Sequence, residues 1–300
     1  MSFIVYIISY PFLWLLSRLP IRILYIISDF FYFIIYYVVG YRKKVVKSNL
    51  ELVFPLKTDS EITQLSKQFF RHLIDLMIES VKSFSISEKE ILKRYKYKNP
   101  ELINNLAKQG KSIALVGAHK GNWEWIVSLP FAIDIDVYGS YTKLANPYFE
   151  KKIKKARSRF GFIGIKTTET VKKIHLNSLK KKQGLYILLS DQSPMVHKSH
   201  YWKEFFGVKV PIHTGAEMLA KKYDFAVVYY NTTKIKRGYY ESEFTLITDT
   251  PKKYEKFELM DEYLSITEKV IKEQPAYYLW SHKRFKHKDK YNQWLNSRKK

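Results

Sequence analysis

The segment Ile113–Glu124 (IALVGAHKGNWE) joins a short apolar run to a cluster of polar side chains. Its first part, 113–118, is typical of a buried strand, and residues 123–129 are typical of a helix. On one continuous helix, two residues five positions apart point about 140° away from each other, so His119 and Glu124 would not meet. If His119 lies in the loop and Glu124 in the first helical turn, we expect their side chains to be in contact.

A histidine beside a carboxylate is suited to proton transfer. The carboxylate fixes the tautomer of His119, and the other ring nitrogen is then able to take a proton from a hydroxyl group. The alternative is an ordinary strand-to-helix junction, because a single His-x4-Glu pattern occurs often by chance. Gly121 and Asn122, which lie between the two residues, would let a substrate approach the backbone closely.

Segments typical of strands and helices alternate along the rest of the chain. This alternation predicts an α/β fold with a mostly parallel central sheet flanked by helices, in one domain spanning residues 41–300. No repeat or Gly/Ser linker divides this region. The expected strands are 113–116, 136–141, 185–189, 225–231 and 243–247. The expected helices are 44–54, 59–84, 86–109, 122–130, 147–160, 168–181, 213–222 and 256–273.

Polar residues follow several of the expected strands. In open α/β sheets, ligand sites gather beyond the carboxyl ends of the strands. His119 follows the first strand, Tyr141 ends the second, and Asp191 and Gln192 follow the third. We favour a role for Asp191 in lining the site over a structural turn, because a carboxylate is seldom placed without purpose at the end of a buried strand.

The composition limits the possible chemistry. The chain has no cysteine, which excludes disulfides, thiolate zinc sites and cysteine nucleophiles. The net charge of +24 favours a polyanionic partner, such as nucleic acid, an anionic membrane surface or a phosphorylated substrate, although lysine-rich codon usage is an alternative. His197 and His200 have a spacing that suits a metal, but no acid or third ligand is near them, so we expect no metal site.

Two further basic regions have open interpretations. Arg157 and Arg159 stand in a lysine-rich stretch, which is either a solvated helix face or a contact for phosphates or an acidic protein. His282 and Arg284 follow an aromatic run near the C-terminus, where phosphate or membrane contact and structural packing are equally favoured.

The first forty residues are mostly apolar. Residues 3–16 and 21–39 form two apolar runs, and the absence of an early basic residue and of an Ala-x-Ala site favours a retained membrane element over a secretory signal. The second run is long enough to span a bilayer, but Asp29 at mid-depth would be costly. We therefore assign residues 1–40 to a membrane anchor, either a single span or an interfacial hairpin, with a pair of buried core helices as the alternative.

A basic cluster, Arg42 to Lys47, follows this apolar segment directly. By the positive-inside rule, the domain that follows is expected on the cytoplasmic side. A basic protein with an apolar head meets anionic lipid more simply than nucleic acid, so we expect membrane lipids as partners and no nucleic acid.

In their order and spacing, these motifs resemble the late acyltransferases of lipid A biosynthesis, a branch of the lysophospholipid acyltransferase superfamily. The resemblance runs over nearly the whole chain and includes the apolar head. It is carried by 40–55, Gly117–Glu124, Tyr141–Pro147, Asp191–Pro194, Phe205–Gly207, Thr214–Gly215 and Trp280–Arg284.

The resemblance implies that His119 is the general base and Glu124 its orienting partner. The implied reaction moves a fatty acyl group from a thioester, on acyl carrier protein or coenzyme A, to a hydroxyl of a lipid A precursor. It needs no cofactor or metal and takes place at the cytoplasmic face of the cell inner membrane. Backbone N–H groups near Gly121 and Asn122 are candidate donors to the developing oxyanion.

One position departs from the family pattern. Thr142 stands where the family usually carries arginine after a tyrosine, and Lys143 offers a positive charge one position later, although as a point charge only. An ornithine- or glycerol-type lipid acceptor therefore stays open. So does a membrane-tethered basic binding protein, although it would not explain His119 and Glu124. The expected substrate-binding residues are Lys120, Gly121, Asn122, Tyr141, Thr142, Lys143, Asn146, Arg159, Asp191, Gln192 and Arg284.

Overall fold

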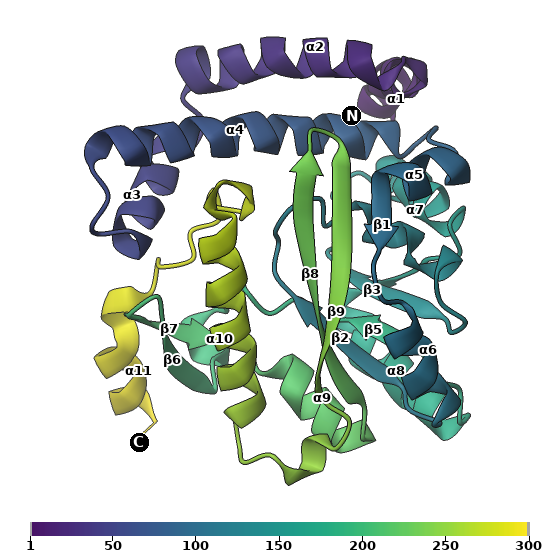
Figure 1. Ribbon diagram of the computed structural model, residues 1–300, viewed down its shortest axis with the longest axis vertical. Coiled ribbons are helices and arrows are strands. Elements are labelled where there is room, and N and C mark those ends of the chain that lie inside the picture. Colours follow the sequence, from purple (N-terminus) through teal and green to yellow (C-terminus); the bar gives the residue numbers. More distant parts are fainter. Residues whose placement is uncertain (1, 299–300) are drawn as a thin grey trace.

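The computed structural model describes residues 2–298 and has an α/β fold (Figure 1). A seven-stranded sheet has the order β1-β9-β8-β2-β5-β3-β4, and every pair in it is parallel except β8 with β9. The predicted fold class, a mostly parallel sheet flanked by helices, is confirmed. Its strands are β1 (Tyr95–Tyr97), β2 (Ile113–Gly117), β3 (Val137–Tyr141), β4 (Ile163–Lys166), β5 (Leu185–Ile187), β8 (Ala226–Lys236) and β9 (Tyr239–Thr248). A separate antiparallel hairpin consists of β6 (Tyr201–Phe205) and β7 (Val208–Ile212).

Helices cover both faces of the sheet, and side chains that alternate along each strand build two apolar cores. Ala114 and Val116 of β2 belong to one core, together with residues of α8, α9 and α10. Ile113 and Leu115 point to the other core, with residues of α5, α6 and the 3-10 helix at Trp125–Phe131. The helices on the sheet are α5 (Glu88–Arg94), α6 (Glu101–Lys108), α7 (Pro147–Ser158), α8 (Thr170–Leu179), α9 (Gly215–Tyr223) and α10 (Glu258–Glu273). The last helix of the described chain is α11 (Tyr291–Ser297).

The sequence missed several elements. The helix expected at 86–109 is divided into α5 and α6 by the short strand β1. The strand β4 and the hairpin β6–β7 were not predicted either, because strands of three to five residues carry too few positions to show a period. The helix expected at 122–130 is a 3-10 helix that begins at Trp125 and contains Pro130, which has no N–H to donate to an α-helical hydrogen bond.

The N-terminal helices lie across one end of the molecule (Figure 1). They are α1 (Ser2–Arg18) and α2 (Ile21–Phe33), and α2 continues as a π-helical segment to Val39. The α2 helix runs along α4 (Asp59–Lys82), and α3 (Lys43–Val53) connects the two regions. The stretch Ile21–Val39, with a mean hydropathy of 1.6, is long and apolar enough to cross a membrane by length and composition, and 22% of it is buried against the protein.

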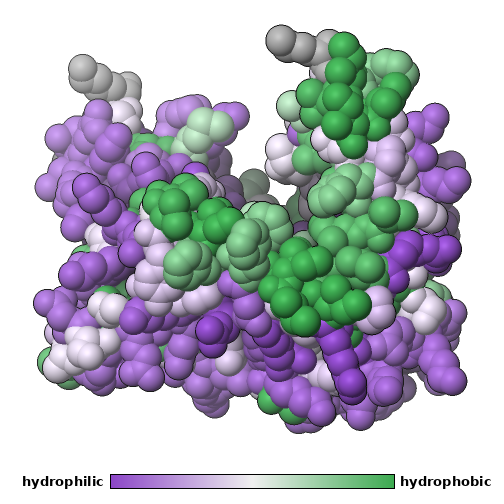
Figure 2. Space-filling model, turned by 90° about the horizontal axis from the view of Figure 1, so that it is seen from above, coloured by the Kyte–Doolittle hydropathy of each residue, from purple (hydrophilic) through white to green (hydrophobic). Residues whose placement is uncertain are grey.

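The outer surfaces of α1 and α2 are apolar. Figure 2 shows apolar side chains gathered over these helices on one face of the molecule, with hydrophilic residues around them. Ile8 and Phe12 of α1 are 70% and 67% exposed, and Ile26 of α2 is 70% exposed. Asp29, which would be costly inside a bilayer, is paired with Arg237 at a distance of 2.9 Å instead. The structure therefore places α2 flat against the protein, with one polar and one apolar side.

Candidate active site

The side chains of His119 and Asp191 meet at the carboxyl ends of two neighbouring strands. His119 follows β2 and Asp191 follows β5, and these strands are paired. The Nδ1 atom of His119 lies 2.7 Å from Oδ1 of Asp191, and the backbone N–H of His119 donates to Oδ2 of Asp191 at 3.1 Å. One carboxylate thus fixes both the ring and the backbone of the histidine.

Burial and charge act in opposite directions on this pair. Burial alone would lower the pKa of the His119 imidazole and raise the pKa of the Asp191 carboxyl group. Their mutual attraction and hydrogen bonds outweigh burial, so the pKa of His119 is raised and the pKa of Asp191 is lowered. Asp191 is therefore ionised at neutral pH, and a neutral His119 donates from Nδ1 and leaves Nε2 as a base. The Nε2 atom lies 3.4 Å from the side-chain amide nitrogen of Gln192.

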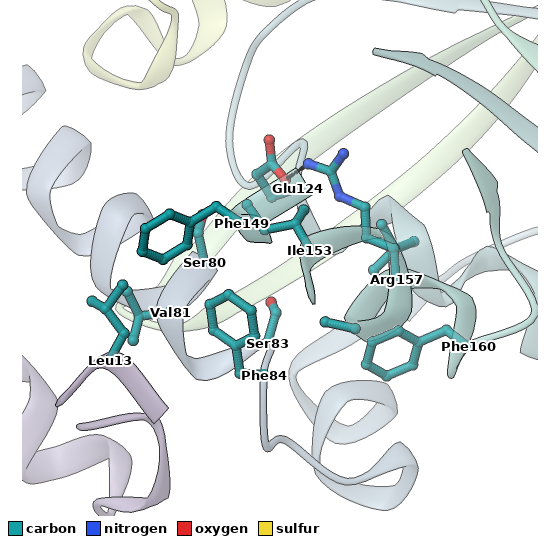
Figure 3. A pocket seen from close by; sticks show the side chains of 12 residues that line it. Leu13, Ser80, Val81, Ser83, Phe84, Glu124, Phe149, Ile153, Arg157 and Phe160 are labelled. Carbon is teal, nitrogen blue, oxygen red and sulfur yellow. Dashed lines mark hydrogen bonds and ion pairs between the residues drawn. The ribbon is translucent and has the colours of Figure 1, made fainter. Parts of the chain in front are cut away.

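The expected contact between Glu124 and His119 is wrong. Glu124 accepts a hydrogen bond from Nη2 of Arg157, in α7, at 2.6 Å (Figure 3). The reason is that Asp191 already accepts from the Nδ1 position of His119, while Arg157 offers Glu124 a cation. Both Glu124 and His119 still line the same cavity of about 640 Å³.

The residues between them hold the loop in place, contrary to their expected role in substrate binding. Lys120 is 2% exposed and donates from Nζ to the carbonyl of Thr232 at 3.1 Å, and burial lowers its pKa to about 8. Gly121 has a φ of +61°, and a Cβ atom there would lie 2.9 Å from the carbonyl oxygen of Thr232. The backbone N–H of Gly121 donates to the carbonyl of Tyr277 at 2.9 Å. This bond removes Gly121 as an oxyanion donor, so that prediction is wrong for Gly121.

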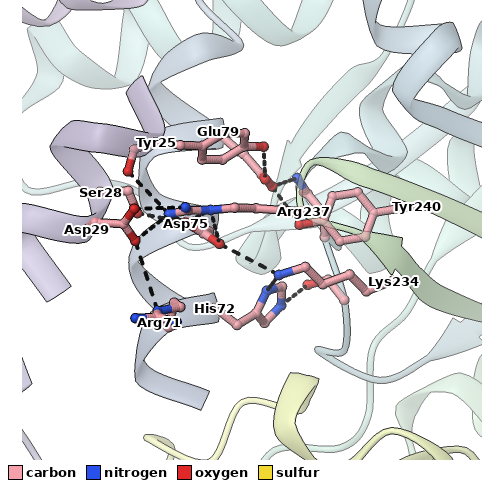
Figure 4. Close-up of polar contacts among 12 residues, drawn as sticks. Tyr25, Ser28, Asp29, Arg71, His72, Asp75, Glu79, Lys234, Arg237 and Tyr240 are labelled. Atoms are coloured by element: carbon pink, nitrogen blue, oxygen red, sulfur yellow. Dashed lines mark hydrogen bonds and ion pairs between the residues drawn. The ribbon is translucent and has the colours of Figure 1, made fainter. Parts of the chain in front are cut away.

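Side chains of α4, among them His72 and Glu79 in Figure 4, hold the same loop. Asn122, which was expected to bind substrate, donates from Nδ2 to Oε2 of Glu79 at 2.7 Å. The hydroxyl groups of Tyr240 and Tyr25 also donate to Glu79, at 2.9 and 2.7 Å. Burial outweighs these bonds and raises the pKa of Glu79 to about 7. About two turns earlier in α4, Nε2 of His72 lies 3.1 Å from the carbonyl oxygen of Gly121.

The same network extends to α2. Arg237, in the turn between β8 and β9, pairs with Asp75 of α4 at 2.6 Å and with Asp29 of α2. Ser28 of α2 donates to Asp75 at 2.7 Å. The apolar N-terminal helix and the His119 loop are therefore fastened to one face of α4, through Asp75 and Glu79.

Two residues at the carboxyl end of β3 line the cavity, as expected. Tyr141 and Thr142 both line it, and the hydroxyl of Tyr141 donates to Glu150 at 3.1 Å. Lys143 is exposed in the loop that follows. The side chain of Asn146 caps the first turn of α7, where Oδ1 accepts from the backbone N–H of Tyr148 at 3.0 Å. That contact gives Asn146 a structural part in place of the expected contact with substrate.

The two predicted arginines lie elsewhere. Arg159 donates to the backbone carbonyls of Phe84 and Ile86, at 2.8 and 2.6 Å, and so ties the end of α7 to the chain after α4. Arg284 is 1% exposed and donates to the carbonyl of Pro211 at 3.1 Å. Its guanidinium lies over the ring of Phe205, so of the two interpretations left open for Arg284 the structure supports structural packing, in place of the expected contact with substrate.

Arg157 is a member of the cavity that the sequence did not single out. Arg157 lines the His119 cavity and pairs with Glu124, whereas Arg159, two positions later, points away. The only signal was the basic character of this helix, and it did not distinguish one arginine from the other. For metals, no group of three or more His, Asp or Glu side chains within residues 2–298 is placed to hold an ion.

The chain thus has an α/β fold in which His119, hydrogen-bonded to Asp191, lies at the carboxyl edge of a mostly parallel sheet. A family model for bacterial lipid A biosynthesis acyltransferases matches residues 2–287, nearly the whole chain. The chain therefore belongs to this family and is an acyltransferase. No match was found among curated proteins.

Proposed function

We propose that this protein transfers a fatty acyl group from a thioester to a hydroxyl group of a lipid A precursor, with His119 as the general base. The observation that carries the proposal is the bond between His119 Nδ1 and Asp191, which leaves Nε2 available at the wall of a 640 Å³ cavity. Family membership supports acyl transfer as the reaction. Acyl carrier protein and coenzyme A are the two donor carriers that we consider, and the reaction needs no resident cofactor.

The proposed mechanism uses one histidine as base and then as acid. Nε2 of His119 takes the proton of the acceptor hydroxyl as its oxygen attacks the thioester carbonyl carbon, and the charge of Asp191 stabilises the imidazolium. The tetrahedral intermediate then collapses, the carbon–sulfur bond breaks, and the imidazolium returns its proton to the leaving thiolate. General base catalysis of this kind contributes about 10²–10⁴-fold to the rate.

We further propose that Arg157 supplies the positive charge that Thr142 does not. Both residues line the His119 cavity, and both also line a smaller neighbouring cavity of about 240 Å³. A guanidinium group binds carboxylates and phosphates through two parallel hydrogen bonds, which a single lysine does not. Arg157 is therefore better placed than the exposed Lys143 to bind an anionic group of the acceptor.

The acceptor test uses the purified protein. A lipid A precursor with a hydroxylated acyl chain is incubated with acyl carrier protein thioester or with acyl coenzyme A, and the lipids are analysed by mass spectrometry. We expect the precursor to gain one acyl group, and we expect lipid A from a strain lacking this protein to lose the same mass. If only an ornithine- or glycerol-type lipid gains the acyl group, the proposed acceptor is wrong.

We also propose that α1 and α2 lie in the interface of a membrane, on the cytoplasmic face of the inner membrane. An amphipathic helix with one face held by the protein and an apolar outer face binds in the plane of the bilayer. The ion pair of Asp29 with Arg237 supports this arrangement over a single span, because a span would have to break it.

Charged residues on this surface are expected to weaken membrane binding. Ile8→Glu combined with Ile26→Glu should lower co-sedimentation with phosphatidylethanolamine and phosphatidylglycerol vesicles several-fold, since both side chains are 70% exposed. Leu179→Glu is a matched control, because Leu179 is 68% exposed at the end of α8, far from α2 in Figure 1. Equal sedimentation of the double variant and the control would contradict the interfacial role of α1 and α2.

A further inference from the structure

A second, apolar cavity of about 340 Å³ lies between α1, the end of α4, and α7 (Figure 3). We call it the α7 cavity. Its walls include Phe84 after α4 and Phe149, Ile153 and Phe160 in and after α7. Its size falls in the range of ligand pockets, about 300–1,000 Å³. Mostly hydrocarbon side chains line it, so its chemistry suits a hydrocarbon chain.

One side of the α7 cavity reaches the apolar surface of the molecule. Leu13 of α1 lines the cavity, and Phe12 and Leu15 beside it in sequence are 67% and 65% exposed. Both residues belong to α1, whose apolar outer surface we assign to the membrane interface (Figure 2). A lipid chain would therefore meet mostly apolar side chains between the bilayer and the α7 cavity.

The other side of the α7 cavity reaches the catalytic centre. Glu124, Val127 and Arg157 line both this cavity and the larger one that contains His119. In Figure 3, Glu124 and Arg157 stand on the opposite side of the cavity from Leu13. The two cavities thus share a wall. Among its three residues the charged ones are Glu124 and Arg157, which pair with each other and are 32% and 28% exposed.

Acyl transfer to a lipid brings two hydrocarbon chains to His119, one on the donor and one on the acceptor. We propose that the α7 cavity holds an acyl chain of the acceptor lipid, an inference that rests on the proposed function. A hydroxyl carried near the head of such a chain would lie at the wall of Glu124 and Arg157, on the His119 side. The acceptor arrives from the membrane, where the cavity begins, whereas a donor on a soluble carrier arrives from the aqueous side.

The test fills part of the α7 cavity by a substitution in each of two helices that line it. Ala156→Phe in α7 and Ser80→Phe in α4 each place a ring inside it, and both positions are only partly buried, so the fold should tolerate the change. Ser158→Phe, at an exposed position of the same helix, is the matched control. We expect the two variants to raise the KM for a hydroxyacylated lipid A precursor about tenfold or more, with the donor KM unchanged. The control should behave as the unsubstituted protein.

Two outcomes would overturn the proposal. An unchanged acceptor KM in both variants would show that the cavity does not hold the acceptor chain. A shift of preference towards shorter donor chains, with an unchanged acceptor KM, would assign the cavity to the donor.

A binding measurement separates this proposal from the proposed function. The His119→Ala protein is mixed with a glucosamine disaccharide lipid that carries a diazirine on its hydroxyacyl chain, and the labelled peptides are sequenced after irradiation. We expect labels on Ile153, Ala156 and Phe84, whether or not the natural protein turns this lipid over. Labels confined to the walls at Ser140 and Ile187, in the other cavity, would contradict the assignment.

Discussion

Replacing His119 with alanine is expected to lower kcat/KM for acyl transfer by about 10²–10⁴-fold. The imidazole is the group that takes the proton of the acceptor hydroxyl, and Asp191 and Gln192 beside it do not replace a base at that position. The measurement is the initial rate of acyl transfer from a labelled thioester, with thermal unfolding of the variant as a check on its fold.

His197→Ala is the matched control for this prediction. His197 is exposed and lies outside the cavity of His119, so its removal should leave the rate unchanged. If the His119→Ala protein unfolds at the same temperature as the unsubstituted protein and transfers acyl groups equally fast, His119 is not the base.

Replacing Asp191 with asparagine is expected to lower the rate by a similar factor and also to change its pH dependence. The charge and hydrogen bonds of Asp191 raise the pKa of His119 above its ordinary value of 6.5. As the pH falls through the raised pKa, the imidazole becomes protonated and stops acting as a base, so the rate declines. Without the aspartate charge the pKa of His119 falls, and the acidic limb of kcat/KM moves to lower pH.

Glu124→Gln distinguishes the two carboxylates near His119. Glu124 contributes to the raised pKa of His119 by charge only and less than Asp191 does, because its hydrogen bond goes to Arg157. We expect the acidic limb of kcat/KM to move less in Glu124→Gln than in Asp191→Asn. An equal or larger shift in Glu124→Gln would contradict the assignment of Asp191 as the orienting group. It would restore the role that the sequence suggested for Glu124.

Much of the fold was predictable because its central strands are long or strongly apolar. All five residues of β2 are buried, and the alternation of strands with amphipathic helices indicated a parallel sheet. The short strands β1 and β4 were not predictable, since they become strands only by pairing with β9 and β3. The 3-10 helix at Trp125 likewise depends on its surroundings: the side chain of Asn122 accepts from the backbone N–H of Trp125 at 3.0 Å.

The position of the site at the carboxyl edge of the sheet was predictable, but the hydrogen-bond partners of its side chains were not. The carboxyl ends of neighbouring parallel strands meet at one edge, which is why His119 and Asp191 were both expected there. The identity of the carboxylate that bonds the imidazole was not predictable from spacing. Glu124 is close to His119 along the chain, yet Gly121 turns the backbone in between and Arg157, from another helix, takes the glutamate.

The sequence by itself determined the fold class, the histidine at the end of the first long strand, and the apolar N-terminal segment, because these depend on local periodicity and composition. Only the tertiary structure decided which side chains meet: Asp191 with His119, Arg157 with Glu124, and Arg237 with both Asp29 and Asp75. Each of these contacts joins segments more than thirty residues apart. The direction in which a side chain points across such a distance depends on how the strands and helices pack, which no local pattern records.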